Sequence, residues 1–202
     1  MVSAPRGVTT CIAHTLGAAP KPPGNRYRGG SSSKAHGIAV DSYIAYTINQ
    51  HPPSARKPRK SRNAASILDA LAACGLRLHS TQVRYTCARR NISAVLDGEA
   101  RDAFGHAVAV EWKTGYSYRR SRQRRLQLPH LEGLYDNARN RALLQLCVGM
   151  VLSGAQHGCL IFANGLKKPE VLWLPKAMPQ FFRPGAAEDI IAALSGAERL
   201  RV

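Results

Sequence analysis

Three ionisable residues near the middle of the chain have types and spacing that suit phosphoester chemistry. Asp97 follows an apolar run, and Glu111 and Lys113 follow the run AVAV. Side chains alternate along a strand, so Glu111 and Lys113 would share one face while Trp112 points to the other. If the two strands pair as a hairpin, Asp97 can lie beside Glu111. Two carboxylates there would form an oxygen-rich site suited to Mg²⁺ or Mn²⁺, with the backbone carbonyl of Trp112 as a third ligand.

Such a site explains why charges follow a strand that otherwise looks like buried core. A divalent cation and a lysine would neutralise carboxylates that could not otherwise stay there. A metal bound by two carboxylates can activate water and stabilise the negative charge that develops on a phosphodiester. Lys113 would orient the nucleophile and help to hold the phosphate. The pattern predicts metal-dependent hydrolysis of phosphodiester bonds.

The pattern of Asp97 followed by Glu111-Trp112-Lys113 resembles the D…(D/E)xK signature of the PD-(D/E)XK nuclease superfamily. The branch resembled contains the nuclease domain of RecB, lambda-type exonucleases and viral alkaline exonucleases. That branch has a glutamine on the helix after the ExK strand, and Gln145 matches it. The resemblance implies an α/β fold with a restriction-endonuclease-like core, in which helices flank a central mixed β-sheet.

The resemblance also implies roles for individual residues. Asp97, Glu111, Lys113 and Gln145 would be catalytic, and Asp97 and Glu111 would hold the metal. The branch has an acidic residue on its first helix. Asp41 fits that place by its helix face, and His36 is the alternative ligand.

The hydrophobic pattern predicts elements that could position these residues. Helices are expected at 34–49, 63–75, 137–154 and 186–200, and strands at 81–87, 91–98, 106–115, 158–163 and 171–174. The first three strands are joined by short turns and read as an antiparallel meander. The long helix and further strands that follow are typical of an α/β domain in which that helix covers one face of a mixed sheet.

The organisation of the chain is predicted to be one domain with an N-terminal arm. Residues 1–33 contain no acidic residue and include a run rich in Pro, Gly and Ser, which indicates a basic, disordered arm. An organellar transit peptide is an alternative for this segment. Residues 34–202 would form the nuclease-like domain.

The net charge of +17 indicates a polyanionic partner. Nucleic acid is the first candidate. An anionic membrane surface is the weaker alternative, because no basic amphipathic helix stands out and no run is long enough to span a bilayer. The five scattered cysteines suggest reduced core residues of an intracellular protein, and a nuclear or organellar location stays open.

A loop after the ExK strand could handle the substrate. Arginines would grip phosphates and tyrosines would stack on bases, which suits DNA with a free end or a single strand. The residues of this predicted nucleic-acid-binding loop are Tyr116, Tyr118, Arg119, Arg120, Arg122, Arg124 and Arg125. The competing interpretation is a solvated basic loop.

Each feature of the site also has a structural interpretation. Asp97-Gly98 could form a hairpin turn, Glu111 and Lys113 a surface pair, and Gln145 a polar helix position. The favoured function is a DNA exonuclease of recombination, replication or genome processing. The alternatives are a nucleic-acid-binding protein with an inactive or coincidental nuclease-like fold, and a structure-selective endonuclease.

Overall fold

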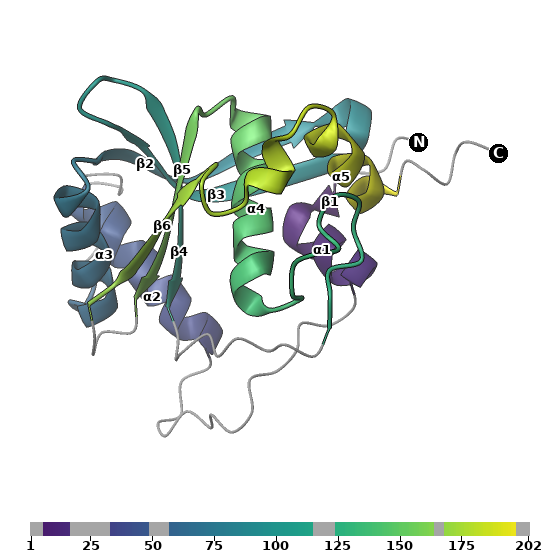
Figure 1. Ribbon diagram of the computed structural model, residues 1–202. Helices are drawn as coiled ribbons and strands as arrows, with labels where there is room; N and C mark the ends of the chain where they lie inside the picture. Colours follow the sequence, from purple (N-terminus) through teal and green to yellow (C-terminus); the bar gives the residue numbers. More distant parts are fainter. Residues whose placement is uncertain (1–5, 17–32, 49–56, 115–123, 164–167, 197–202) are drawn as a thin grey trace.

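The computed structural model describes residues 6–16, 33–48, 57–114, 124–163 and 168–196 (Figure 1). The strands of this part of the chain are β1 Arg6–Gly7, β2 Arg77–Cys87, β3 Ile92–Arg101, β4 Ala107–Thr114, β5 His157–Ala163 and β6 Glu170–Leu174. Its α-helices are α1 Val8–Leu16, α2 Ser33–Thr47, α3 Arg62–Ala73, α4 Ala138–Ser153 and α5 Ala186–Ser195. Short 3-10 helices cover Ala88–Arg90 and Pro179–Phe182.

One mixed sheet forms the centre of the molecule. Its order is β1-β3-β4-β5-β6, and β2 pairs with the other edge of β3. Strand β3 is antiparallel to both β2 and β4, as the meander prediction requires, whereas β4 and β5 are parallel and are connected through α4. A parallel pair needs such a crossover connection, which a helix usually provides. The predicted fold class, a mixed sheet flanked by helices, is therefore confirmed.

Two helical layers cover the two faces of the sheet (Figure 1). Helices α1, α4 and α5 pack on one face and form what we call the α4 core, which includes Leu96, Ala109 and Leu160 of the sheet. Helices α2 and α3 pack on the other face and form the α2–α3 core, which includes Trp112. Because neighbouring residues of β4 belong to different cores, the strand is buried on both faces, which explains its nearly continuous apolar sequence.

Helix α4 begins and ends at polar and glycine caps. The Asn137 side chain accepts a hydrogen bond from the Asn140 backbone N–H at 2.9 Å, and Gly154 ends the helix with φ of 72°. The helix approaches β3 very closely at Gly149. A Cβ atom there would lie 2.5 Å from Leu96 Cδ2, so only a glycine permits this packing.

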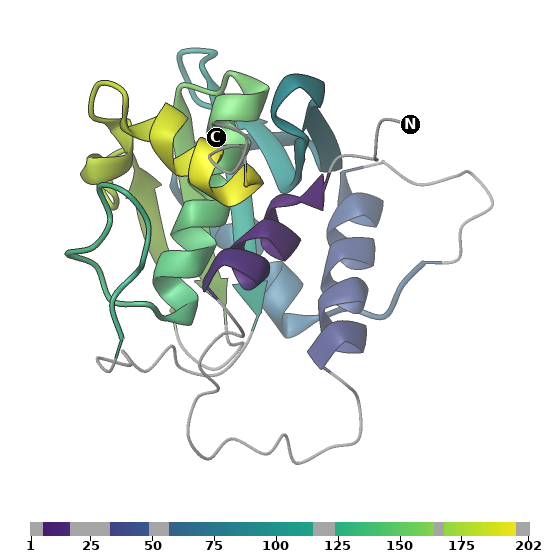
Figure 2. The same ribbon diagram turned by 90° about the vertical axis from the view of Figure 1, so that its right-hand side faces the viewer.

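The N-terminal segment differs from its prediction. Residues 6–16 were expected in a disordered arm, but β1 pairs with the start of β3 and α1 is buried against α4 and α5 (Figure 2). The Arg6 guanidinium also donates to the Ser195 carbonyl at 2.7 Å. The domain therefore includes residues before 34. Residues 17–32, which carry most of the Pro- and Gly-rich run, lie outside the described residues.

The reason for this correction is visible in the sequence. The buried residues of α1 are Val8, Cys11, Ile12 and Leu16, a helical spacing of apolar side chains. The prediction of a disordered arm was based on the absence of acidic residues and on the Pro-, Gly- and Ser-rich run. Neither feature reports whether an apolar helix face is buried.

All five cysteines are free, as predicted from their scatter. Cys11, Cys147 and Cys159 are buried, and Cys74 and Cys87 are half-buried. Within the described ranges, no helix has both the length and the apolar character that crossing a bilayer requires.

Candidate functional site

The candidate site lies where β3 and β4 separate. β4 pairs with β3 from Ala107 to Val110, and β1 takes the same edge of β3 at Ile92 and Ser93. Asp97 lies between these two pairings and next to the register position of Glu111. The prediction placed Asp97 at a strand end, but β3 continues to Arg101 and the hairpin turn follows it. Asp97 and Glu111 nevertheless lie side by side, as expected. The longer hairpin pairs Gly98 with Val110, which brings the two residues before and after this pair together.

Where the pairing of β3 with β4 ends, the Asp97 carboxylate replaces a backbone hydrogen bond between the two strands. Its Oδ2 accepts a hydrogen bond from the Trp112 backbone N–H at 2.9 Å, and its Oδ1 lies 3.4 Å from Gln82 Nε2. These contacts exclude the simple Asp-Gly turn interpretation. They also fix the carboxylate beside the C-terminal part of β4.

Glu111 and Lys113 form an ion pair on the α4 side of the sheet. The Lys113 ammonium donates to Glu111 Oε1. The Glu111 side chain is fully buried, whereas 28% of the Lys113 side chain is exposed. The pair is therefore not the ordinary surface pair of the competing interpretation. It has a fully buried carboxyl group inside and an ammonium at the border with solvent.

The second oxygen of Glu111 is poorly satisfied. The pKa of Glu111 is raised to about 8, mainly by burial and then by the nearby Asp97 charge, while Lys113 opposes both effects. Among the described residues, Oε2 has no hydrogen-bond partner. The Asp97 carboxyl stands beside Glu111, but two carboxylates can hydrogen-bond only if one of them carries a proton. A shared proton or a cation would relieve this arrangement, so the residues fit a divalent metal.

Helix α2 brings a third carboxylate to the same place. The Trp112 indole donates to Asp41 Oδ1 at 2.8 Å. Burial raises the pKa of Asp41, the indole hydrogen bond lowers it, and the charges of Asp97 and Lys113 also act on it. Asp41 is thus within electrostatic range of the predicted site, on the opposite side of β4 from α4.

His36 lies elsewhere on α2. Its Nε2 is 2.7 Å from Asn63 Nδ2 of α3, so its described contact is with the neighbouring helix. Five residues of helix separate His36 from Asp41, a rise of about 7.5 Å. The geometry favours Asp41 as the α2 residue of the site.

Gln145 lies on α4, the helix that packs on β3 and β4. Its side chain is half-buried, between the buried Leu144 and Leu146. The small residues Ala142 and Gly149 of the same helix are both buried. The catalytic role of Gln145 stays a prediction.

The predicted nucleic-acid-binding loop falls mostly outside the described residues. This applies to Tyr116, Tyr118, Arg119, Arg120 and Arg122.

The two described arginines of that loop contact their own chain. The guanidinium of Arg124 is 3.8 Å from the buried Asp136 carboxylate. Arg125 lies 3.9 Å from the centre of the Tyr135 ring and donates to the Gly133 carbonyl. Both side chains remain largely exposed, so these contacts leave a role in binding untested.

One acidic neighbour of the site was missed. Glu99 lies two residues after Asp97 on the same strand, and this spacing could have identified it. Its Oε2 accepts a hydrogen bond from Ser80 at 2.7 Å, and its Oε1 accepts one from the Tyr85 hydroxyl, which raises the pKa of Tyr85 to about 12. Because both oxygens are engaged with β2, Glu99 positions β2 against β3.

Comparisons with known proteins found only distant similarity to solved structures. No family profile matches the chain, and no curated protein matches it. Among solved structures, a candidate exonuclease from Eubacterium rectale is 13% identical, with a TM-score of 0.41, over 94% of this chain and 81% of that one. A protein designated SSO0001 is 13% identical, with a TM-score of 0.34, over 90% and 83%. Similarity this weak carries no functional argument, so function must be argued from the site.

Proposed function

We propose that the protein is a divalent-metal-dependent nuclease that hydrolyses DNA phosphodiester bonds, and that it is an exonuclease acting in recombination, replication or genome processing. The observation that carries this proposal is the arrangement of Glu111: a fully buried carboxyl group with one oxygen on Lys113 and the other, beside Asp97, without a hydrogen-bond partner in the described part of the chain. Burying a group of this kind costs free energy unless a ligand compensates it. Groups with strongly shifted pKa values are concentrated at functional sites.

The carboxylates of Asp97 and Glu111 would hold Mg²⁺ or Mn²⁺, with the Trp112 carbonyl and Asp41 as further candidates. When bound, such a cation supplies a Lewis acid and positive charge for the phosphodiester. Lys113 is suited to positioning the reactants, because its ammonium contacts Glu111 and its side chain is partly exposed to solvent. There it can hold a nucleophile or a phosphate oxygen in place.

The substrate class follows from charge. The chain carries 29 Lys and Arg against 12 Asp and Glu, so a phosphodiester polymer would be attracted to it over long range. Asp97 and Glu111 form a small acidic cluster within this basic chain. A metal-assisted phosphodiesterase needs such a cluster to bind its cation. A free DNA end or a single strand is the proposed form of the substrate.

The test is digestion of linear and circular DNA by purified protein with Mg²⁺, with Mn²⁺ and with EDTA. We expect linear DNA alone to be lost, and only with metal. Nicking of circular or branched DNA would instead identify a structure-selective endonuclease. Binding of DNA without cleavage under every metal condition would contradict the nuclease proposal and favour the inactive-fold alternative.

Site variants give the sharper version of this test. Lys113→Ala and Glu111→Ala should each lower the cleavage rate by roughly 10²- to 10⁴-fold or more while DNA binding with EDTA stays largely intact. The matched control is Lys176→Ala, which removes an exposed lysine after β6 and should retain full activity. Undiminished degradation by Lys113→Ala would overturn the assignment.

A further inference from the structure

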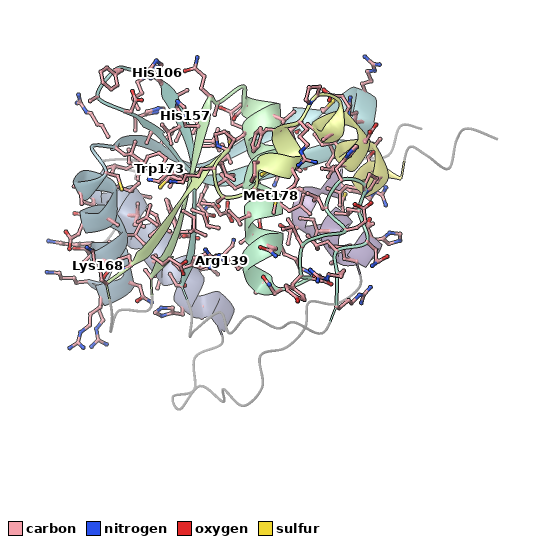
Figure 3. All side chains as sticks on the ribbon, viewed as in Figure 1. His106, Arg139, His157, Lys168, Trp173 and Met178 are labelled. Carbon is pink, nitrogen blue, oxygen red and sulfur yellow. The ribbon has the colours of Figure 1, made fainter. Side chains whose placement is uncertain are left out.

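A second cluster of metal-binding side chains lies at the opposite end of the β3–β4 hairpin. Asp102 and His106 flank the hairpin turn, and His157 begins β5. One ligand atom from each of the three lies within 4.8 Å of the others. Figure 3 shows His106 and His157 close together at the same end of the sheet. The β4–β5 register explains this, because Val108 pairs with His157.

We propose that Asp102, His106 and His157 form a binding site for a transition-metal ion of the Zn²⁺ class. Two imidazoles and one carboxylate are the ligand set of many protein zinc sites and also suit Co²⁺ or Ni²⁺. Imidazole is a poor ligand for Mg²⁺, so this site differs in chemistry from the Asp97–Glu111 site. The Asp102, His106 and His157 cluster is called the hairpin site below.

The turn holds the Asp102 carboxylate in place. Its Oδ1 accepts hydrogen bonds from the backbone N–H groups of Phe104 and His106, each at 2.9 Å. The backbone closes the same turn, with Asp102 N to His106 O at 3.2 Å and Gly105 N to Asp102 O at 3.0 Å. Gly105 has φ of 85°, a conformation that favours glycine. Oδ2 is therefore fixed in the direction of His106 Nδ1, 2.9 Å away.

The histidines can complete the site by small rotations. Their ring centroids are 5.9 Å apart with an interplanar angle of 72°, so the rings are not stacked on each other. Donors on a tetrahedral ion at ~2.1 Å lie about 3.4 Å apart, closer than the 4.8 Å limit here. The His106 side chain is 47% exposed and can move by this amount. Its exposure also leaves room for water as a fourth ligand.

The role of the hairpin site would be structural. His106 and Glu111 are five residues apart on an extended chain, so about 17 Å separates them, too far for a shared reaction. An ion there would link the β3–β4 turn to the first residue of β5. This hairpin carries Asp97 and Glu111, so the ion would stabilise the strand pair that presents the candidate catalytic residues.

The experiment is calorimetric titration of untagged, full-length protein with Zn²⁺ in excess Mg²⁺, which occupies carboxylate sites. We expect one equivalent to bind to wild-type protein, and His106→Ala and His157→Ala each to weaken binding by at least about tenfold. The control is His79→Ala, an exposed histidine on β2, which should leave the affinity unchanged. No binding by wild-type protein, or equal binding by the His106→Ala/His157→Ala double variant, would overturn the proposal.

A measurement on wild-type protein guards against variants that fold poorly. Bound Co²⁺ should shift or broaden the imidazole NMR signals of two of the seven histidines, and adding Zn²⁺ should restore them. Effects confined to other histidines, or a cysteine-to-cobalt charge-transfer band, would place the ion elsewhere and contradict the assignment. This outcome is independent of nuclease activity.

Discussion

The Glu111 carboxyl is the residue on which the chemistry of the candidate site depends. In the absence of metal, burial and the Asp97 charge raise its pKa to about 8. Its ordinary value is 4.5, so at neutral pH the folded protein keeps a proton that the unfolded chain would release. Metal binding must displace that proton, because a protonated carboxyl is a poor ligand.

The first consequence is proton release on metal binding. Below pH 8, Mg²⁺ or Mn²⁺ should release close to one proton, and its affinity should rise roughly tenfold per pH unit until the pH reaches the pKa. Calorimetry in buffers of different ionisation enthalpy counts the protons. A Glu111→Gln variant is the control, since it has no such proton. Wild-type binding that is independent of pH between 6 and 8 would show that Glu111 is not a ligand.

The same pKa shift predicts how stability depends on pH. Because the folded pKa is raised, the contribution of Glu111 to metal-free stability is fully present below about pH 4.5 and is lost as the pH rises through about 8. We expect the wild-type free energy of unfolding to fall from pH 6 to 8.5 by more than that of Glu111→Gln. Urea unfolding of both proteins with EDTA measures the difference. Parallel curves would contradict a raised pKa.

At the scale of elements, α4 determines how closely the α4 core packs on the site. The helix touches β3 at Leu96, the residue before Asp97, and has no room for a side chain at Gly149. A larger residue there would push the helix away from the strand that carries Asp97. The close approach therefore connects a packing position to the geometry of the candidate site.

This packing predicts opposite effects for two glycines in helices. Gly149→Ala should destabilise the protein by about 1–3 kcal/mol, because its Cβ would clash with Leu96. Gly37→Ala on α2, where a Cβ meets nothing within 4 Å, should stabilise by up to about 1 kcal/mol. Chemical denaturation measures both. The Gly149→Ala/Leu96→Ala pair should cost less than the sum of its single variants; strict additivity would argue against the contact.

The elements were largely predictable, and their boundaries and the N-terminal pairing were not. Periodicity located α2, α3, α4 and the five longer strands, because each buries an apolar face. The meander also placed Asp97 near Glu111. What the sequence could not supply was the length of the hairpin, because the expected connection over residues 98–106 shortens to a turn between Asp102 and His106. Local residue preference does not show that residues 98–101 continue the strand, and only their pairing with β2 and β4 decides it.

The site was predictable in its strand residues and less so in its helical ones. Strand alternation is a short-range rule, so Glu111 and Lys113 could be assigned to one face. The positions of Asp41 and His36 depend on how α2 packs, which long-range contacts decide. Trp112 shows the limit most clearly: its carbonyl as a metal ligand stays a prediction, whereas the bonds of its N–H groups to Asp97 and Asp41 were not foreseen.

At the scale of the whole molecule, the charge of +17 predicts salt-sensitive binding of DNA. Each neutralised phosphate contributes a slope of about −0.9 to log affinity against log salt, so four contacts would cost about a hundredfold between ~50 and ~200 mM salt. Fluorescence anisotropy with a labelled oligonucleotide and EDTA measures the slope. The affinity of Glu111→Gln should fall with the same slope, and salt-independent binding would contradict an electrostatic interface.

The contact between Arg6 and Ser195 joins residues 189 positions apart. A ribosome makes β1 and α1 before it makes α4 and α5, which cover the apolar face of α1. The apolar face of α1 therefore stays exposed to solvent until α4 and α5 have been synthesised. The parallel neighbour of β3, strand β1, belongs to the same early segment. The core that supports Asp97 is consequently completed late in synthesis, after residue 195 has emerged.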